Sequence, residues 1–377
     1  MKPSRLEISL PVLQANCRAL RRFLPSGTAL CAVIKADGYG HGLLQSAAAF
    51  AQGGADCVAV ARCAEGVVLR EGGFAGRIIV LGPPDDAAAA VAHELESMIA
   101  TPAHIRQLAA AAQAFRRVAR VHVKLDTGMS RLGARTTEEV TALAQALAEE
   151  RFVTVAAVFS HLACADAPDD EPIKRQLARF HALTAPLDAR GLAPLCHIAN
   201  SAAMLRNSDC LLGMVRPGLA MYGCAPSPQI PLPDGIGPAM RWVAPIERLQ
   251  WVPAGTEISY GARHVTQRET LLATVGIGYG DGYHRAVGRG CVLIGGQRAP
   301  VLGAVCMDHL MADVTDIAAR GADIGEEAVL LGEQQGAVLT ADDLAEAWGT
   351  IPYEVMLARL PRVQRVYTRD ALWDSQA

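Results

Sequence analysis

Residues 29–42 read ALCAVIKADGYGHG, an apolar run that ends at Lys35 and is followed by three glycines around Asp37, Tyr39 and His41. The apolar run has the length and composition of a buried strand. A lysine at its end, with a flexible turn behind it, indicates a strand that delivers a polar group to a defined place. No G-x-G-x-x-G pattern follows this strand, which argues against the competing interpretation, an open doubly wound sheet.

Short apolar runs with helical segments between them recur through the first two thirds of the chain. Helix-start signals mark some of those segments, as at Thr101-Pro102 and Thr136. Strand–helix alternation predicts βαβ units and a parallel sheet, and eight strands are the number that closes a (β/α)₈ barrel. The expected strands are ALCAVIK ending at Lys35, CVAV at 57–60, RIIVL at 77–81, SMIA at 97–100, VARVHVK ending at Lys124, FVTVAAVFSH ending at His161, LCHIAN ending at Asn200 and LLGMVR ending at Arg216.

The pattern changes near residue 235. A Pro/Gly-rich segment, LPDGIGPAM, precedes apolar runs separated by turn residues, such as MRWVAPIERLQWV and ETLLATVGIGYG. We therefore expect a (β/α)₈ TIM-like barrel over residues 1–235 and a mostly β domain over residues 236–377. Residues 1–9 are expected to form a strand that joins the second domain.

The composition of the chain narrows the range of functions to consider. The chain has 377 residues, 51% of them hydrophobic, which suits two domains with large cores. A formal charge of −3 gives no reason to expect a nucleic acid or an acidic membrane as partner. The ten cysteines are scattered without C-x-x-C spacing, so neither a metal site nor a redox dithiol is expected. With neither a secretory signal nor a long apolar span recognised, we expect a cytoplasmic protein.

Polar residues stand at the ends of the expected strands, where a barrel places its active site. They are Lys35, Lys124, His161, Asn200 with Ser201, and Arg216. Any one of them could simply meet water at a strand end. Together they predict a cationic barrel mouth that binds an anionic ligand such as a phosphate or a carboxylate.

Lys35 is the candidate nucleophile of this mouth. Desolvation and neighbouring positive charges lower the pKa of a lysine, and a neutral amine can then bond to an aldehyde such as pyridoxal phosphate. Ser201, with Asn200 before it, begins an expected helix that could bind the phosphate. Gly218, in VRPGLAMYG, is a second candidate because glycine allows close approach of the backbone.

Seven motifs resemble those of one family, the alanine racemases, which are fold-type III pyridoxal phosphate enzymes. They are AVIKADGYGHG, KLDTGMSRLG, HIANSAA, VRPGLAMYG, SYGA, GYGDGY and CMDHLM, in the family's order. The resemblance extends from RLEISLPVLQAN to IPYEVMLARLPR, nearly the whole chain. One departure is Ala304 in GAVCMD, where many family members have an arginine associated with the channel entrance.

The resemblance implies two catalytic bases. Lys35 would hold the cofactor covalently and act on one face of the substrate, and Tyr260 of a partner subunit would act on the other. A phenol needs support to act as a base, which a Tyr260–His161–Arg216 chain would supply. Arg216 would hydrogen-bond the pyridine nitrogen and leave it unprotonated, because an arginine does not readily release a proton.

The resemblance also implies the remaining roles. Arg131 and the backbone N–H of Met307 from the partner would hold the substrate carboxylate, and a carbamylated Lys124 would position Arg131. No metal and a homodimer are implied. The cofactor-binding residues implied are Lys35, Tyr39, His161, Asn200, Ser201, Arg216, Gly218, Leu219 and Tyr353.

The implied activity is the interconversion of L-alanine and D-alanine, for peptidoglycan synthesis or for alanine catabolism. A broad-specificity or serine-preferring racemase would share every catalytic residue, so it stays open as an alternative. A non-catalytic pyridoxal phosphate-binding protein would lack the second domain that carries Tyr260. A fold-type III decarboxylase would normally have a longer chain and a catalytic cysteine motif.

Overall fold

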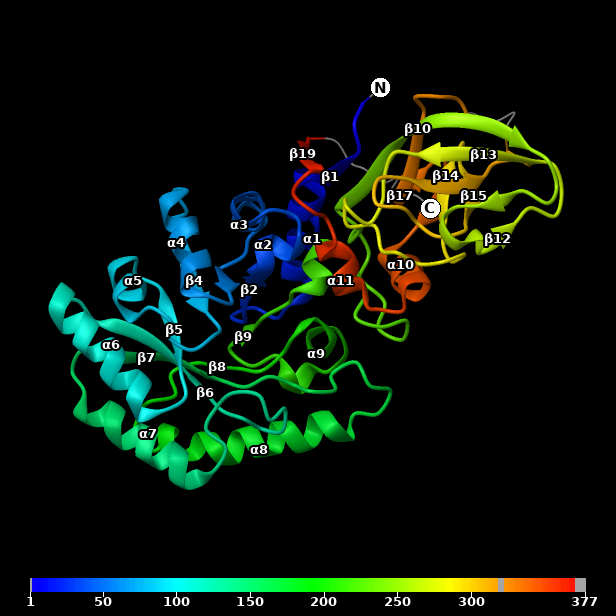
Figure 1. Ribbon diagram of the computed structural model, residues 1–377. Coiled ribbons are helices and arrows are strands. Elements are labelled where there is room, and N and C mark those ends of the chain that lie inside the picture. Colours follow the sequence, from blue (N-terminus) through cyan, green and yellow to red (C-terminus); the bar gives the residue numbers. More distant parts are fainter. Residues whose placement is uncertain (1, 318–321, 370–377) are drawn as a thin grey trace. The chain divides into compact units, whose positions relative to one another are not determined.

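The computed structural model describes residues 2–317 and 322–369. The chain divides into two compact units (Figure 1). The first, Leu13–Ile236, is called the barrel unit below. The second combines Met1–Val12 with Gly237–Ala377 and is called the β unit.

The barrel unit contains a closed barrel of eight parallel strands. Each strand pairs with the next along the chain, and β9 returns to β2 with Met214 opposite Ala29. This confirms the expected (β/α)₈ barrel and all eight of its strands. The strands are β2 (Ala29–Val33), β3 (Cys57–Val60), β4 (Arg77–Val80), β5 (Glu96–Ile99), β6 (Ala119–Lys124), β7 (Val153–Phe159), β8 (Cys196–His197) and β9 (Met214–Val215).

Helices follow the strands and lie on the outside of the barrel, as α4 to α8 show in Figure 1. Two of them start where the sequence predicted. Thr101 accepts a hydrogen bond from the backbone of His104, and Thr136 forms a capping box with Glu139. The helices are α1 (Leu10–Phe23), α2 (Lys35–Tyr39), α3 (Leu43–Gln52), α4 (Cys63–Glu71), α5 (Ala87–Ala92), α6 (Pro102–Phe115), α7 (Thr137–Glu149), α8 (Glu171–Asp188) and α9 (Ser201–Arg206), with 3₁₀ turns η1 (Ser208–Cys210) and η2 (Leu219–Tyr222).

The strands end slightly earlier than the sequence suggested. Lys124 is the last residue of β6, but Lys35 lies two residues beyond β2 and Arg216 one residue beyond β9. Asn200 lies three residues beyond β8 and belongs to the next helix, since its side chain caps α9. The polar residues therefore begin the βα loops at the carboxyl end of the barrel, where catalytic groups of this fold lie.

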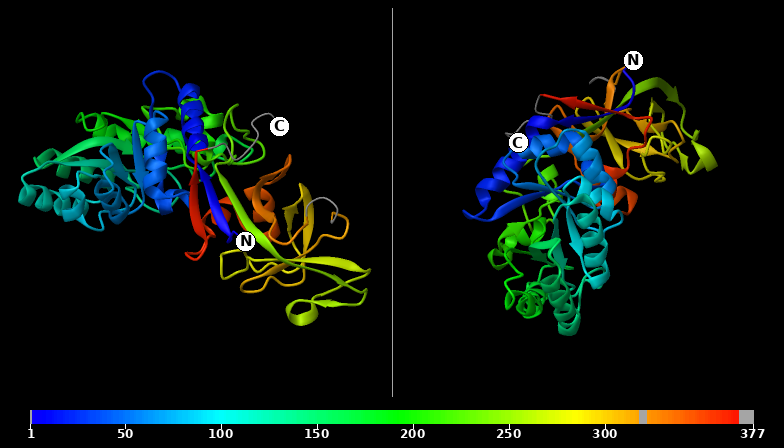
Figure 2. Two further views of the ribbon diagram at one scale, coloured as in Figure 1. Left: turned by 90° about the horizontal axis from the view of Figure 1, so that it is seen from above. Right: turned by 90° about the vertical axis from the view of Figure 1, so that its left-hand side faces the viewer.

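The strands of the β unit pair antiparallel, except that β1 and β19 are parallel. The pairings β10–β13–β16–β15–β14–β17–β10 form a closed circuit. β1, blue in Figure 2, lies between β10 and β19. The elements are β1 (Arg5–Ser9), β10 (Met240–Val252), β11 (Glu257–Ile258), β12 (His264–Val265), β13 (Thr270–Val275), β14 (Cys291–Ile294), β15 (Gln297–Leu302), β16 (Leu310–Asp313), β17 (Glu327–Gln334), β18 (Ala337–Leu339) and β19 (Gln364–Thr368), with η3 (Tyr260–Ala262), α10 (Ala341–Trp348) and α11 (Pro352–Leu357).

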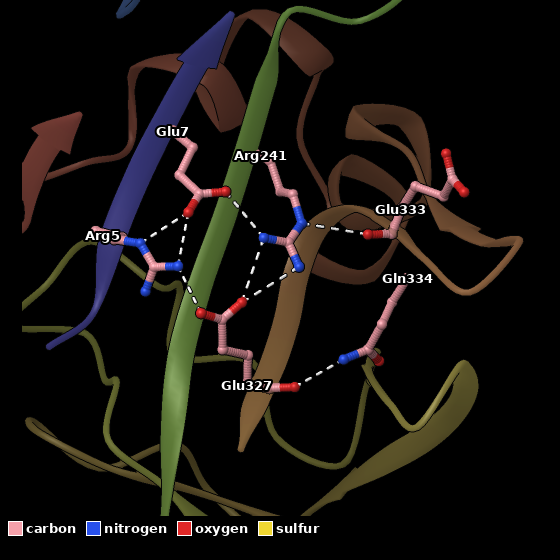
Figure 3. A network of polar contacts seen from close by, with 6 residues as sticks. All are labelled: Arg5, Glu7, Arg241, Glu327, Glu333 and Gln334. Carbon is pink, nitrogen blue, oxygen red and sulfur yellow. Dashed lines mark hydrogen bonds and ion pairs between the residues drawn. The ribbon is translucent and has the colours of Figure 1, made fainter. Parts of the chain in front are cut away.

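Alternating charges tie three of these strands together (Figure 3). Arg5 of β1 contacts Glu7 at 2.6 Å and Glu327 of β17 at 2.5 Å. Arg241 of β10 contacts Glu7 at 2.8 Å and Glu327 at 3.4 Å. Every member thus has two partners of opposite charge, and these contacts join β1 and β17 to β10 in addition to the backbone pairing of each with β10.

Candidate active site

Lys35 is followed by a turn of unusual handedness. Ala36, Asp37 and Tyr39 have φ values of 53°, 55° and 51°, and Gly38 and Gly40 have 62° and 81°. All five residues are therefore left-handed, which costs an L-residue roughly 1–2 kcal/mol. The sequence accounts for the two glycines, whereas the three other residues need support from their surroundings.

The turn brings Tyr39 against the loop after β9. A Cβ atom on Gly218 would lie 2.4 Å from the Tyr39 hydroxyl oxygen, so a larger residue would displace the Tyr39 ring. The Ser201 Oγ accepts hydrogen bonds from the backbone N–H groups of Gly218 and Ala220, at 3.0 and 3.2 Å. With both acceptor positions used, the Ser201 hydroxyl proton remains to be donated. Hydroxyl and N–H donors of this kind suit the oxygens of a phosphate.

Four cationic side chains gather at the same end of the barrel. Burial, then the charges of Arg131 and Arg216, lower the pKa of Lys35. Burial, then Arg216, lowers the pKa of Lys124 to about 7, against a weaker opposing effect of Asp126. Burial lowers the pKa of Arg216 to about 10, which leaves its guanidinium charged at neutral pH. Within residues 2–317 and 322–369, Arg216 forms no ion pair that would balance this charge. This excess of positive charge favours an anionic ligand.

Arg216 is held by a chain of hydrogen bonds that crosses the barrel interior. Its Nη1 donates to Nδ1 of His197 at 2.5 Å, and Nε2 of His197 lies 3.0 Å from Nδ1 of His122. Nε2 of His122 lies 2.8 Å from the Glu96 carboxylate. Arg216 can only donate, so each histidine must accept at Nδ1 and donate from Nε2. The chain is therefore complete with both histidines neutral.

The charges at the far end of this chain agree with that assignment. Burial lowers the pKa of both His122 and His197, which keeps them neutral. Burial alone would raise the pKa of Glu96, but hydrogen bonds from His122 and Arg77 outweigh it and hold that pKa well below its usual range. Arg77 contacts Glu96 through two bonds of 2.9 Å. Arg216 is thus oriented by a neutral connection to a carboxylate anchored at the start of β5.

Comparison with known proteins identifies the family. The family models for the N-terminal and C-terminal domains of alanine racemase match residues 8–226 and 239–367. The chain belongs to the alanine racemase family. An alanine racemase of Symbiobacterium thermophilum is 40% identical over 97% of each chain. The solved structure of alanine racemase from Streptomyces coelicolor is 38% identical over 98% of each chain, with a TM-score of 0.90. That of Bacillus anthracis with bound L-Ala-P is 31% identical over 98% of this chain and 96% of that chain, also with a TM-score of 0.90.

The barrel unit of this alanine racemase family member contains ten of the residues singled out from sequence. His161 lies next to Arg216, with Nδ1 3.3 Å from Nη2. Arg131 is near enough to lower the pKa of His161, after burial and Arg216. The ten are Lys35, Tyr39, Lys124, Arg131, His161, Asn200, Ser201, Arg216, Gly218 and Leu219.

The β unit contains the other three, Tyr260, Met307 and Tyr353, which are 67%, 52% and 39% exposed. Tyr260 follows Ser259, whose φ is 63° and whose Oγ donates to the Ala304 carbonyl at 2.5 Å. That bond holds the Tyr260 turn against the segment that leads to Met307.

Sequence reasoning missed several residues of the site. His122 and His197 form the hydrogen-bond chain that orients Arg216. The ring of Phe159 faces two cations, with its centroid 5.3 Å from both Lys124 Nζ and Arg216 Cζ. Strand alternation could have identified His122, because it stands two residues before Lys124 in VHVK and must face the same side of β6. In the described part of the chain, no three His, Cys, Asp or Glu side chains are arranged to hold a metal ion. No described helix is long and apolar enough to cross a lipid bilayer.

Proposed function

We propose that this protein interconverts L-alanine and D-alanine with pyridoxal phosphate as cofactor. The observation that carries the proposal is the barrel mouth, where Lys35 lies buried near Arg131 and Arg216 and has a lowered pKa. The lowered pKa increases the fraction of neutral amine, which is the form that bonds to an aldehyde. The anionic partners that this site requires are the phosphate of the cofactor and the carboxylate of the amino acid.

The residues at the mouth fit the cofactor at both of its ends. Tyr39, Ser201, Gly218 and Leu219 would receive the phosphate, with Asn200 capping the helix that presents Ser201. Arg216 would donate a hydrogen bond to the ring nitrogen. We assign Tyr353 to the phosphate and His161 to the ring by family resemblance. When bound, pyridoxal phosphate supplies an electron sink for the bond that breaks at the α-carbon.

The chain's own residues would move the proton. Lys35 removes the α-proton on one face of the substrate, and Tyr260 donates one on the opposite face, with the roles reversed in the other direction. Arg131 and the Met307 N–H hold the substrate carboxylate so that the α-carbon stays between the two bases. The hydrogen-bond chain to Glu96 keeps Arg216 oriented, and an arginine does not readily release a proton to the ring.

The two bases belong to different units of the chain, and we infer a homodimer with shared sites. The exposure of Tyr260 and Met307 on the β unit supports this, because an exposed side chain can reach the site of a second copy. In a two-fold dimer each β unit would complete the barrel mouth of the other copy.

The test is an assay of the protein loaded with pyridoxal phosphate on each enantiomer of alanine. Both directions should proceed with equal kcat/KM, because the equilibrium constant between enantiomers is one. Lys35→Ala should remove the activity, and borohydride should attach the cofactor to the peptide that contains Lys35. L-serine and D-serine serve as comparison substrates. Faster turnover of serine, or attachment to another lysine, would contradict the proposal.

A further inference from the structure

Glu65 uses its two carboxylate oxygens for two separate purposes. It is the third residue of α4, and its Oε2 accepts the backbone N–H groups of Ala61 and Arg62 at 2.8 and 3.1 Å. The bond to Arg62, the residue before the helix, belongs to the capping box of α4. Its Oε1 accepts the backbone N–H of Ala36 at 2.7 Å. A helix cap needs only one oxygen, so the bond to Ala36 has another explanation.

Ala36 is the first left-handed residue after Lys35. The rest of the turn is bonded locally, with Gly38 N–H on the Ile34 carbonyl and Gly42 N–H on the Asp37 carbonyl, both at 2.8 Å. The Asp37 side chain accepts the N–H of Leu43, also at 2.8 Å. These bonds shape the turn but leave the N–H of Ala36 to an acceptor outside it. Glu65 supplies that acceptor from the first turn of α4, which follows the next strand of the barrel.

We propose that Glu65 is a positioning residue, which holds the left-handed turn 36–40 against the β3–α4 loop and thereby fixes Lys35 and Tyr39 at the barrel mouth. The proposal rests on the function proposed above for Lys35, since it concerns the residue that aims it. Glu65 does not need to touch the cofactor or the substrate. Its effect passes through the peptide that joins Lys35 to Ala36.

The charge of Glu65 also affects the pKa of Lys35. Burial and the charges of Arg131 and Arg216 lower the pKa of Lys35, whereas the Glu65 carboxylate opposes them. A neutral side chain at position 65 would therefore lower the proton affinity of the Lys35 nitrogen further.

The chain contains a matched control. Glu139 caps α7 in the same way, with Oε2 accepting the N–H groups of Arg135 and Thr136 at 2.6 and 3.2 Å. Glu139→Gln therefore weakens an equivalent capping box without touching residues 34–42. Glu65→Gln can satisfy either the cap or Ala36 but not both, because an amide has only one oxygen. Glu65→Ala removes both acceptors.

The first experiment is hydrogen–deuterium exchange on the cofactor-free protein, which needs no activity. The peptide that covers residues 34–42 should exchange about fivefold faster in Glu65→Ala than in wild type, with a smaller or equal effect in Glu65→Gln. Glu139→Gln should leave that peptide unchanged. Unchanged exchange of residues 34–42 in both Glu65 variants would overturn the proposal.

The second experiment separates positioning from stability. On binding pyridoxal phosphate, the absorbance of the lysine-bound cofactor should titrate about half a pH unit lower in Glu65→Gln than in wild type. The apparent Kd for the cofactor should rise about fivefold, because fewer molecules hold the turn ready. An identical titration and an identical Kd in Glu65→Gln and Glu139→Gln would mean that Glu65 acts only as a helix cap, which would overturn the proposal. If wild type itself bound no cofactor, the proposed function would fail, while the exchange result would still stand.

Discussion

Lys124 offers the sharpest test of the site, through the prediction that its amine carries a carbamate. CO₂ reacts only with a neutral amine, so the neutral fraction decides whether the reaction occurs. A lysine with the ordinary pKa of 10.5 has about one neutral amine in 3,000 at pH 7. With its pKa lowered to about 7, Lys124 has about half of its amines neutral, a gain of about 1,500-fold.

The surroundings of Lys124 favour the product as well. Arg216 and Arg131 both act against a charged amine at this position. A carbamate would replace a positive charge by a negative one and so convert two repulsions into attractions. Its oxygens could then accept hydrogen bonds from Arg131 and hold that side chain ready for the substrate carboxylate.

The assay is ¹³C NMR of the protein equilibrated with ¹³C-labelled CO₂ at fixed partial pressure. One carbamate signal should appear in wild type, and at fixed CO₂ it should grow as the pH rises through about 7, because the neutral amine accumulates above its pKa. Lys124→Ala should lose the signal. That variant should also lose racemase activity, and added acetate should restore part of it by replacing the missing negative charge.

The result that would refute this reasoning is a wild-type spectrum identical to that of Lys124→Ala at pH 8. A signal that persists in Lys124→Ala would instead assign the carbamate to another amine. Pyridoxal phosphate should be bound in both samples, so that Lys35, whose pKa is also lowered, is not free to react.

Three further predictions follow from other parts of the molecule. Co-expressed Lys35→Ala and Tyr260→Phe chains should form a hybrid dimer with up to about half the wild-type activity, since one site regains both native bases; a purified hybrid no more active than its parents would exclude shared sites. His122→Phe should lower the free energy of unfolding by about 1–3 kcal/mol in urea titrations, because the buried His197 N–H loses its acceptor; an unchanged midpoint would contradict the hydrogen-bond chain. Burial raises the pKa of Glu327, but Arg5 and Arg241 outweigh it and lower that pKa. The ionised Glu327 therefore stabilises the folded state above the unfolded-state pKa near 4, and this stabilisation is lost as the pH falls through the folded pKa. The free energy of unfolding of Glu327→Gln should depend less on pH between about pH 5 and 3. Acid titration followed by circular dichroism would measure the difference.

The barrel could be predicted from sequence because its determinants are local. A run such as CVAV at 57–60 needs only apolar β-formers between turn signals to become a strand, and Thr136 followed by Glu139 is sufficient to start α7. Eight such units in succession leave few ways to pair, since each strand joins the next in parallel. The polar residues just after these strands were found for the same reason: the fold itself places them at one end.

The chain of groups behind Arg216 depended on the tertiary structure. His122 and His197 stand 75 positions apart, and Glu96 and Arg216 are further apart still. Each of them alone resembles an ordinary polar residue in or beside a strand. The assembled barrel brings them within hydrogen-bond distance, and burial, together with the charges of Arg216 and Arg77, keeps both histidines neutral.

In the turn after Lys35, some features were determined by the local sequence and others by the tertiary structure, all within nine residues. From the sequence alone, the glycines at 38, 40 and 42 determined that the chain turns there. They did not determine that Ala36, Asp37 and Tyr39 would share the left-handed conformation, which each of them disfavours in isolation. That conformation is held in part by Glu65, 29 residues further along the chain. Local propensity can mark where a chain must bend, but a strained conformation persists only where distant groups satisfy its hydrogen bonds.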